Sequence, residues 1–418
     1  MNFDLNILQD LSVTSSEREL LRGLAQQVRA LAESPANQAR KACWYRHNAC
    51  QPERPLVVIE EETFYEEIEP AYQCRSPLAL YMEKQLRRHL VVDELIGDDR
   101  VIPDEFTVFL HTEKDIFGLH GQTEVLRGDI EAFPTILGPT EMRVWLPESR
   151  QVCDAVEAVI GDILPVVLRN NALMWLNMPT LRLMELMGME EYYYNLCDYP
   201  DEVKALMQFI VEDCLRVAKD MEAQGLLTLN CGNQHTGASS LGFTKELPVS
   251  GPTNTDLRRG KTDVTLRDLW LNTNSQETVG ISPEMYSEFV YPYYKQLCSH
   301  YGAVYYGCCE PIHAIYEPSL SHIPNIRKLS ISAWCDEAEA ARLLRDKNIV
   351  YSRKPSAEFL STTASFDKEG LRAYLMRTLQ LTKGMSAEII FRDVYRLNGE
   401  PWRLKQAVSL FRECVGGL

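Results

Sequence analysis

Short apolar runs that end in polar residues alternate along most of this chain with amphipathic stretches of helical length. The first run, at 56–59, is followed by three consecutive glutamates, and later runs occur at 106–110, 172–176, 226–229, 269–271, 303–306, 329–331, 349–351 and 388–391. Strands that alternate with helices pair in parallel, because each helix carries the chain back to the same end of the sheet. About eight such units in roughly 360 residues fit a (β/α)8 TIM barrel better than an open doubly wound sheet. We therefore predict an α/β fold of the (β/α)8 barrel type.

An N-terminal segment precedes this alternation. Residues 15–33 predict a helix, because apolar residues recur there at helical spacing and Ser15 or Ser16 can cap its start. We expect a helical extension over residues 1–52 and a barrel domain over residues 53–418.

One segment inside the expected barrel departs from the pattern. Residues 244–265, which follow the run at 226–229, are polar and rich in glycine, proline, asparagine and charged residues. A loop of this length is usually a lid or a binding loop. The alternative is a disordered surface insertion.

Composition limits the class of protein. Apolar residues make up 45% of the chain and charged residues 24%, which is typical of a globular protein. A formal net charge of -16 argues against binding to nucleic acid or to an anionic membrane, because both need a basic surface. The start of the chain does not resemble a signal peptide, and the 12 cysteines have no regular spacing. We expect a cytoplasmic protein with reduced thiols.

The run at 303–306 leads into two cysteines and a glutamate. If the strand continued, Tyr306, Cys308 and Glu310 would project from one face and Cys309 from the other. Cys308 and Glu310 would then supply half of a zinc site. The alternative is that both cysteines are small buried hydrophobic residues, as most free cysteines are.

The segment before this run carries a family resemblance. Ser282, Pro283 and Glu284 begin a helix, with a capping hydroxyl, a first-turn proline and an acidic residue at the positive end. A Pro-Tyr-Tyr-Lys sequence, a glycine turn at Gly302 and a strand that ends in a cysteine motif follow. The region resembles the uroporphyrinogen decarboxylase superfamily, over roughly residues 200–410 and most strongly over 281–310. That superfamily includes zinc methyltransferases that work with a corrinoid (cobalamin), so the resemblance implies a barrel and methyl transfer.

The resemblance also bears on the metal ligands. In the methyltransferase branch this strand carries His-x-Cys, and the last barrel strand supplies another cysteine to the zinc ion. Here Cys308 matches the family cysteine, but Tyr306 stands at the histidine position and the last strand ends in Arg392 and Asp393 without a cysteine. Because zinc accepts carboxylates as well as thiolates, we expect Cys308, Glu310 and Asp393 to be the ligands. The arginine-rich substrate motif of the decarboxylase branch is not found.

Further candidates follow other apolar runs, where a barrel places its active site. Glu277 is a candidate acid or ligand, and His235 is a candidate proton donor or ligand. Each has a plain alternative as a surface loop residue or a solvated charge. The candidates for substrate binding are Gln276, Tyr306, Trp334, Lys354 and Arg392.

Three functions are therefore open. The first is a zinc-dependent methyltransferase that moves a methyl group between a small methylated compound and a corrinoid carried by a partner protein. The second is a metal-independent decarboxylase or lyase, in which Lys354, Arg392 and His235 hold a carboxylated substrate. The third is a noncatalytic binding barrel that has lost the family ligands.

Overall fold

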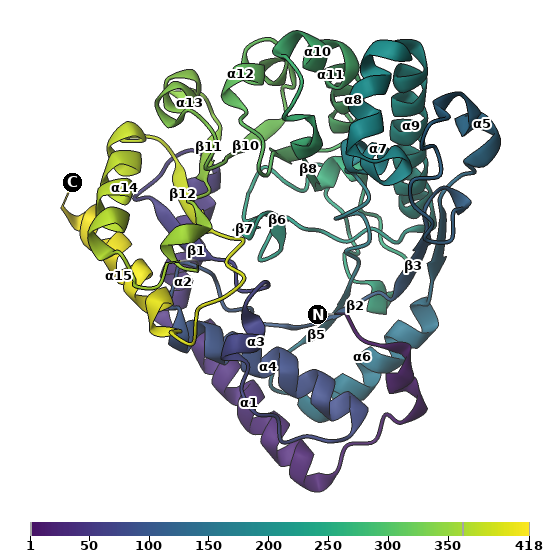
Figure 1. Ribbon diagram of the computed structural model, residues 1–418. Coiled ribbons are helices and arrows are strands. Elements are labelled where there is room, and N and C mark those ends of the chain that lie inside the picture. The colour runs from purple at the N-terminus through teal and green to yellow at the C-terminus, as the bar shows by residue number, and fades with distance from the viewer. Residues whose placement is uncertain (1, 362, 418) are drawn as a thin grey trace.

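The computed structural model describes residues 2–361 and 363–417 and shows an α/β protein with a parallel sheet flanked by helices (Figure 1). Six parallel strands form the main sheet in the order β1-β12-β11-β10-β9-β8. Their bounds are β1 Leu56–Ile59, β8 Trp270–Thr273, β9 Ala303–Tyr306, β10 Ile326–Ile331, β11 Val350–Arg353 and β12 Ala387–Phe391. A parallel pair joins β2 Phe106–Phe109 to β5 Val166–Arg169, and antiparallel pairs join β3 Thr112–Asp115 to β4 Glu141–Val144 and β6 His235–Gly237 to β7 Ser240–Leu241.

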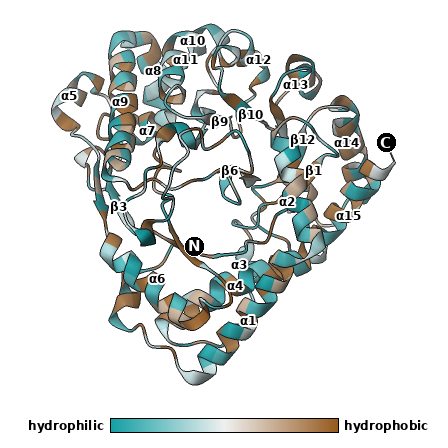
Figure 2. Ribbon diagram, turned by 180° about the vertical axis from the view of Figure 1, so that it is seen from behind, coloured by the Kyte–Doolittle hydropathy of each residue, from teal (hydrophilic) through white to brown (hydrophobic). Residues whose placement is uncertain are grey.

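Most of the helices lie around the outside of a ring that the strands form (Figure 1). The helices are α1 Ser15–Glu33, α2 Pro35–Asn48, α3 Tyr65–Ile68, α4 Pro77–Leu95, α5 Phe133–Ile136, α6 Leu146–Ile160, α7 Pro179–Met187, α8 Met189–Asp198, α9 Pro200–Gln224, α10 Pro283–Phe289, α11 Tyr291–Cys298, α12 His313–Tyr316, α13 Glu337–Leu344, α14 Lys368–Leu381 and α15 Trp402–Gly416. Figure 2 shows both hydrophilic and hydrophobic residues along α1 and α9, as expected of helices with one face on the core. In the described part of the chain, no helix is both long enough and apolar enough to span a membrane.

The ring is not one continuous hydrogen-bonded sheet. Between β1 and β2, Asp99 accepts from the main-chain N–H of Val57 and donates its own N–H to the Val57 carbonyl, both at 2.9 Å. Between β5 and β8, Asn230 exchanges hydrogen bonds with the main chain of Trp270 at 2.8 and 2.9 Å. Side chains thus connect neighbouring strands where no strand-to-strand ladder forms. Among the described residues, the strands do not form one hydrogen-bonded sheet that closes into a barrel.

Several predicted elements need correction. The run at 172–176 is a turn, because the Asn170 side chain accepts from the Ala172 N–H at 2.8 Å and so ends the strand β5. The run at 226–229 lies beside β8 without forming a ladder. The predicted helix over 283–300 is two helices, α10 and α11. Pro292 lies in the first turn of α11, where its missing N–H interrupts no helical hydrogen bond.

The N-terminal helices follow the prediction closely. Helix α1 spans Ser15–Glu33 as expected, but its cap is Thr14, which forms a reciprocal capping box with Glu17. Helix α2 reaches into the ring, because Asn48 donates to the carbonyls of Leu241 and Phe243 at 2.9 and 2.8 Å. The N-terminal extension therefore packs against the interior hairpin β6–β7.

The segment 244–265 contains only the short 3-10 helix Leu257–Arg259, yet its hydrogen bonds fix it in place. The fully buried Asp268 accepts from the N–H groups of Val249 and Ser250 at 2.9 and 2.8 Å and from the Ser250 hydroxyl at 2.5 Å. Leu257, within the segment, has a fully buried side chain. The segment is thus anchored to Asp268 near its start by Val249 and at its end by Thr265.

Replacement of Asp268 by asparagine is expected to free this segment. An amide cannot accept all of the carboxylate's hydrogen bonds, and each buried donor left unpaired costs about 1–3 kcal/mol. Limited proteolysis should cut Asp268→Asn within 244–265 at least several times faster than the parent chain. Asp256→Asn, whose carboxylate caps the short helix inside the same segment, is the matched control and should change the rate less. Equal cleavage rates for Asp268→Asn and the parent would show that Asp268 is not the anchor.

Candidate functional site

The two adjacent cysteines lie just beyond the end of β9. The strand ends at Tyr306, and Gly307 has a φ of +99°, so strand alternation does not extend to Cys308. A β-carbon on Gly307 would meet the Ser330 β-carbon at 3.1 Å, so this bend favours glycine for both reasons. The sulfur atoms of Cys308 and Cys309 are 3.5 Å apart. The expectation that Cys309 points away from Cys308 is therefore wrong, because the strand stops too early.

Glu310 links two strand ends. Its Oε1 accepts from the Ser275 N–H and its Oε2 from the Cys308 N–H, both at 2.8 Å. The side chain is buried, and burial raises the pKa of Glu310 against the lowering by these hydrogen bonds. Both carboxylate oxygens are thus directed at the main chain, where they fix the bend that carries Cys308.

Arg392, which directly follows β12, contacts Glu60, which directly follows β1. Its Nη1 donates to the Sγ of Cys308 at 3.2 Å. Its Nε lies 3.3 Å from Glu60 Oε2 and 3.4 Å from Asp393 Oδ2, as a pair of ion pairs. Burial raises the pKa of Glu60, while the charge of Arg392 opposes that change. Glu60, Cys308 and Arg392 therefore form a compact group at the carboxyl ends of three strands of one sheet.

Lys354 lies directly after β11. Its side chain is 4% exposed, its Nζ donates to the Ser352 hydroxyl at 2.7 Å, and the Nζ stands 5.4 Å from the centre of the Tyr305 ring. Burial lowers the pKa of Lys354 to about 7, against the attraction of Glu388, and the charge of Arg392 adds to the lowering. Among the described residues, no carboxylate forms an ion pair with it. Lys354 and Arg392 are thus two cations that directly follow the adjacent strands β11 and β12.

The predicted zinc ligands do not assemble into a metal site. Within residues 2–361 and 363–417, no three histidine, cysteine, aspartate or glutamate side chains come together as a metal site would require. Glu310 accepts hydrogen bonds from two main-chain N–H groups. Asp393 forms an ion pair with Arg392, and the Arg392 guanidinium donates a hydrogen bond to the sulfur of Cys308. The residues present do not fit a zinc ion in this arrangement.

The remaining candidates lie apart from this group. Tyr306, expected to bind substrate, is fully buried, and its hydroxyl lies 2.5 Å from those of Ser275 and Tyr286, so these two hydroxyls already occupy its polar atom. Glu277 is also buried, and its Oε2 accepts from the Thr180 hydroxyl at 2.7 Å.

Three further candidates are on turns or at a strand start. Gln276 begins a 3-10 turn after β8, and the exposed His235 begins β6. Trp334 follows β10 and is 78% exposed. No hydrogen bond or ion pair joins any of them to Cys308 or Arg392 among the described residues.

Two partners in the group were missed from the sequence. Glu60 is the first of three glutamates that follow β1, and this acidic pattern does not by itself predict a contact with Arg392. Ser352 carries no signal, because a serine inside an apolar strand is common. Its hydroxyl joins Lys354 to Tyr305, whose phenol oxygen lies 3.0 Å away.

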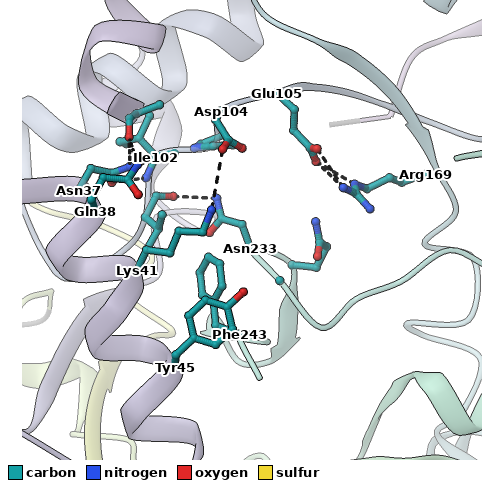
Figure 3. Close-up of a pocket in the computed structure, with 15 residues that line it drawn as sticks. Asn37, Gln38, Lys41, Tyr45, Ile102, Asp104, Glu105, Arg169, Asn233 and Phe243 are labelled. Atoms are coloured by element: carbon teal, nitrogen blue, oxygen red, sulfur yellow. Dashed lines mark hydrogen bonds and ion pairs between the residues drawn. The ribbon is translucent and has the colours of Figure 1, made fainter. Parts of the chain in front are cut away.

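A separate polar cavity lies between α2 and the ends of β2 and β5. Its volume is about 170 Å³, and Figure 3 shows Lys41 and Asp104 on one side and Arg169 with Glu105 on the other. The Arg169 Nη2 is 2.7 Å from Glu105 Oε1, and the Lys41 Nζ is 3.8 Å from Asp104 Oδ2. These charges satisfy one another, and no candidate site residue lines the cavity.

Comparisons with known proteins identify no family. No protein-family model matches the chain, and no curated protein matches it significantly. Among solved structures, a methyltransferase from Methanosarcina mazei aligns with 90% of this chain and 98% of its own, at 10% identity and a TM-score of 0.44. A similarity of that size carries no functional argument. The structure shows an α/β protein with the thiol of Cys308, the cations Lys354 and Arg392 and the carboxylate of Glu60 at the carboxyl ends of its parallel strands.

Proposed function

We propose that this protein is an enzyme that transfers a methyl group between a small methylated oxygen compound and a corrinoid held by a separate carrier protein. The observation that carries the proposal is the placement of Arg392 and Lys354 at neighbouring strand ends beside Cys308. Loss of a methyl group from a methoxyl compound leaves an oxygen anion. Fixed cations in a partly dry site stabilise such an anion, which lowers the barrier for its departure. The corrinoid is the second substrate.

The chain's own residues supply the rest of this mechanism. Glu60 forms an ion pair with the Arg392 guanidinium, and the Ser352 hydroxyl accepts a hydrogen bond from the Lys354 ammonium. We also propose that the ring is a closed eight-stranded barrel, because the Asp99 and Asn230 side chains bridge its gaps. We further propose that the protein is located in the cytoplasm. Zinc held by Cys308, Glu310 and Asp393 would require these side chains to leave their present partners; elemental analysis of the purified protein tests it, and no step here depends on it.

Exposed aromatic residues support a docking face for the carrier. Trp334, Tyr395 and Trp175 are 78%, 66% and 59% exposed, and each follows the carboxyl end of a strand of the ring. Large exposed aromatic side chains are the usual anchors of protein interfaces. Their positions after strand ends support a face on the same end of the ring as Arg392 and Lys354, where a carrier would present its corrinoid.

Replacement of these anchors is expected to weaken carrier binding without affecting the fold. Trp334→Ala and Tyr395→Ala should each raise the Kd for the corrinoid protein at least about tenfold, because a buried aromatic anchor contributes about 2 kcal/mol or more. Titration calorimetry measures the effect. Val249→Ala is the control, since Val249 is also well exposed but lies near Asp268, before β8 begins, and thus at the opposite end. Equal loss in the control would remove the proposed face.

Substrate affinity should depend on the charge of Lys354. Because the pKa of Lys354 is about 7, the ammonium form binds an anion below that pH and the neutral amine above it does not. The KM for an anionic substrate should rise about tenfold as the pH passes through about 7, since a charge-assisted hydrogen bond contributes about 1.5–3 kcal/mol. Lys354→Met should raise the KM and abolish this pH dependence. A wild-type pH profile retained in Lys354→Met would assign the titration to another group.

The decisive experiment follows the corrinoid spectrum. Purified protein, a methoxylated aromatic compound and a reduced corrinoid protein should together produce methylated corrinoid, and omission of the enzyme should stop the reaction. Binding without any spectral change would favour the noncatalytic barrel.

A decarboxylase is the second candidate, and one observation favours it. Lys354 lacks an acidic partner among the described residues, as a residue that receives a substrate carboxylate would. Release of carbon dioxide from an aromatic carboxylate, with no corrinoid present, would establish this activity in place of methyl transfer.

A further inference from the structure

The vicinal thiols have a geometry that neither proposed reaction uses. The Sγ atoms of Cys308 and Cys309 lie 3.5 Å apart, and both side chains are partly exposed. Of the other cysteines, most are buried, and all 12 are free thiols. A contact between two accessible thiols at a strand end differs from the buried single cysteines that fill cores.

The local backbone allows the two sulfur atoms to come closer. The pair lies outside β9, in a bend that begins at Gly307 with its positive φ. Neither residue belongs to a strand ladder. The Gly307 N–H donates to the Thr273 carbonyl of β8 at 2.9 Å, so a small rotation beyond Gly307 leaves the sheet hydrogen bonds in place. The bend is fixed chiefly by Glu310, which holds the N–H of Cys308, and by Ser330, whose hydroxyl donates to the Cys308 carbonyl at 2.8 Å.

We propose that Cys308 and Cys309 are a redox-active pair that a small-molecule disulfide oxidises reversibly to a vicinal disulfide. One cysteine, as its thiolate, attacks the external disulfide, forms a mixed disulfide and releases one small thiol. The second cysteine attacks the bound sulfur, closes the Cys308–Cys309 bond and releases the other small thiol. The two cysteines lose two protons and two electrons in total, and the external disulfide takes up both and becomes two thiols.

Ring strain makes the bond easy to reverse. Adjacent α-carbons are about 3.8 Å apart, which is shorter than the roughly 4.4–6.8 Å of ordinary disulfides. A strained disulfide has a higher reduction potential and is therefore labile, as regulatory disulfides are. The pair is thus suited to a signal that a reducing environment reverses.

Oxidation would also change the neighbouring cation. In the reduced pair, Cys308 Sγ accepts from Arg392 Nη1 at 3.2 Å. Closure of the ring would draw the Cys308 sulfur toward Cys309, so Arg392 would lose this partner and keep only Glu60 and Asp393. The redox state of the pair would thereby alter the position of a group that the proposed reaction requires, although the oxidation itself does not depend on that reaction.

Mass spectrometry tests the pair directly. The full chain is reduced, desalted, exposed to oxidised glutathione, alkylated and digested. We expect the peptide that contains residues 308 and 309 to lose two hydrogen atoms, to take up no alkyl group, and to recover both thiols after treatment with dithiothreitol. Cys309→Ser cannot close the ring, so it should instead retain one glutathione on Cys308. Cys197, which is exposed, is the internal control for an ordinary thiol.

Three results would overturn the proposal. They are a wild-type peptide with both cysteines alkylated after oxidation, a stable glutathione adduct on either cysteine, and a bond from either cysteine to a third cysteine. Circular dichroism of Cys309→Ser shows whether that variant is folded. Because the readout is a mass, failure of the redox pair and failure of methyl transfer are distinguished.

Discussion

Arg392→Gln is expected to lower kcat/KM for methyl transfer by about 100-fold or more, while the protein stays folded. Removal of one fixed donor that faces developing negative charge typically costs about 2.7–4 kcal/mol. Arg392 is the group through which β1, β9 and β12 meet, since it contacts Glu60, Cys308 and Asp393. Steady-state kinetics with the corrinoid protein as the second substrate measures the change.

The controls separate the role of charge from that of geometry. Arg392→Lys keeps the positive charge but not the planar fork, so it should recover only part of the lost activity. Arg396→Gln removes an exposed arginine from the same loop and should leave kcat/KM within about threefold, as surface substitutions away from special features usually do. If Arg392→Gln retained activity at the level of Arg396→Gln, Arg392 would not act on the leaving oxygen.

The positions of these cations could be predicted from the sequence. Lys354 and Arg392 each follow an apolar run, and the carboxyl ends of parallel strands meet at one end of the ring. The structure places both there, on the adjacent strands β11 and β12. What the sequence could not show is which residues pair with them, because Glu60 is more than 300 positions from Arg392 and only the fold joins them.

The error at the cysteines has a specific physical cause. Alternation assigns faces only while the strand continues, and β9 ends at Tyr306. Gly307 is the signal that was available, because a glycine beside an apolar run often marks a bend with a positive φ. The hydrogen bond that Glu310 accepts from Ser275 was not predictable, since Ser275 lies in a different strand–helix unit. A carboxylate in a ligand-like pattern can serve the main chain instead of a metal.

A buried ionic network inside the ring was also invisible in the sequence. Lys328 Nζ donates to the Ser240 hydroxyl at 2.6 Å, and that hydroxyl donates to Glu388 Oε2 at 3.1 Å. His47 Nε2 is also 3.1 Å from Glu388 Oε2. His47, Lys328 and Glu388 are fully buried and come from α2, β10 and β12. The pattern of apolar runs gives no reason to expect charges facing inward from two of those strands.

Lys328→Met is expected to destabilise the protein by about 3–5 kcal/mol, because it leaves the carboxylate of Glu388 buried without its cation. Although burial raises the pKa of Glu388, the charge of Lys328 and the hydrogen bond from His47 hold it well below its ordinary 4.5. A carboxyl with a lowered folded pKa contributes stability that is present above its unfolded pKa and lost as the pH falls. The stability contributed by Glu388 should therefore be present above about pH 4.5 in the parent and reduced in Lys328→Met.

The double variant Lys328→Met with Glu388→Gln decides whether charge is the cause. Removing both charges leaves no unpaired ion, so the loss should be smaller than the sum of the two single losses by at least about 1 kcal/mol, which is within the coupling of residues in one hydrogen-bond network. Urea unfolding of all four proteins gives the values. Strictly additive losses would show that Lys328 acts through packing against Trp44 and Trp270, whose ring centres each lie 5.3 Å from its Nζ, and not through Glu388. Coupling would instead assign the network its role: it holds α2, β10 and β12 together beneath the strand ends that carry Lys354 and Arg392.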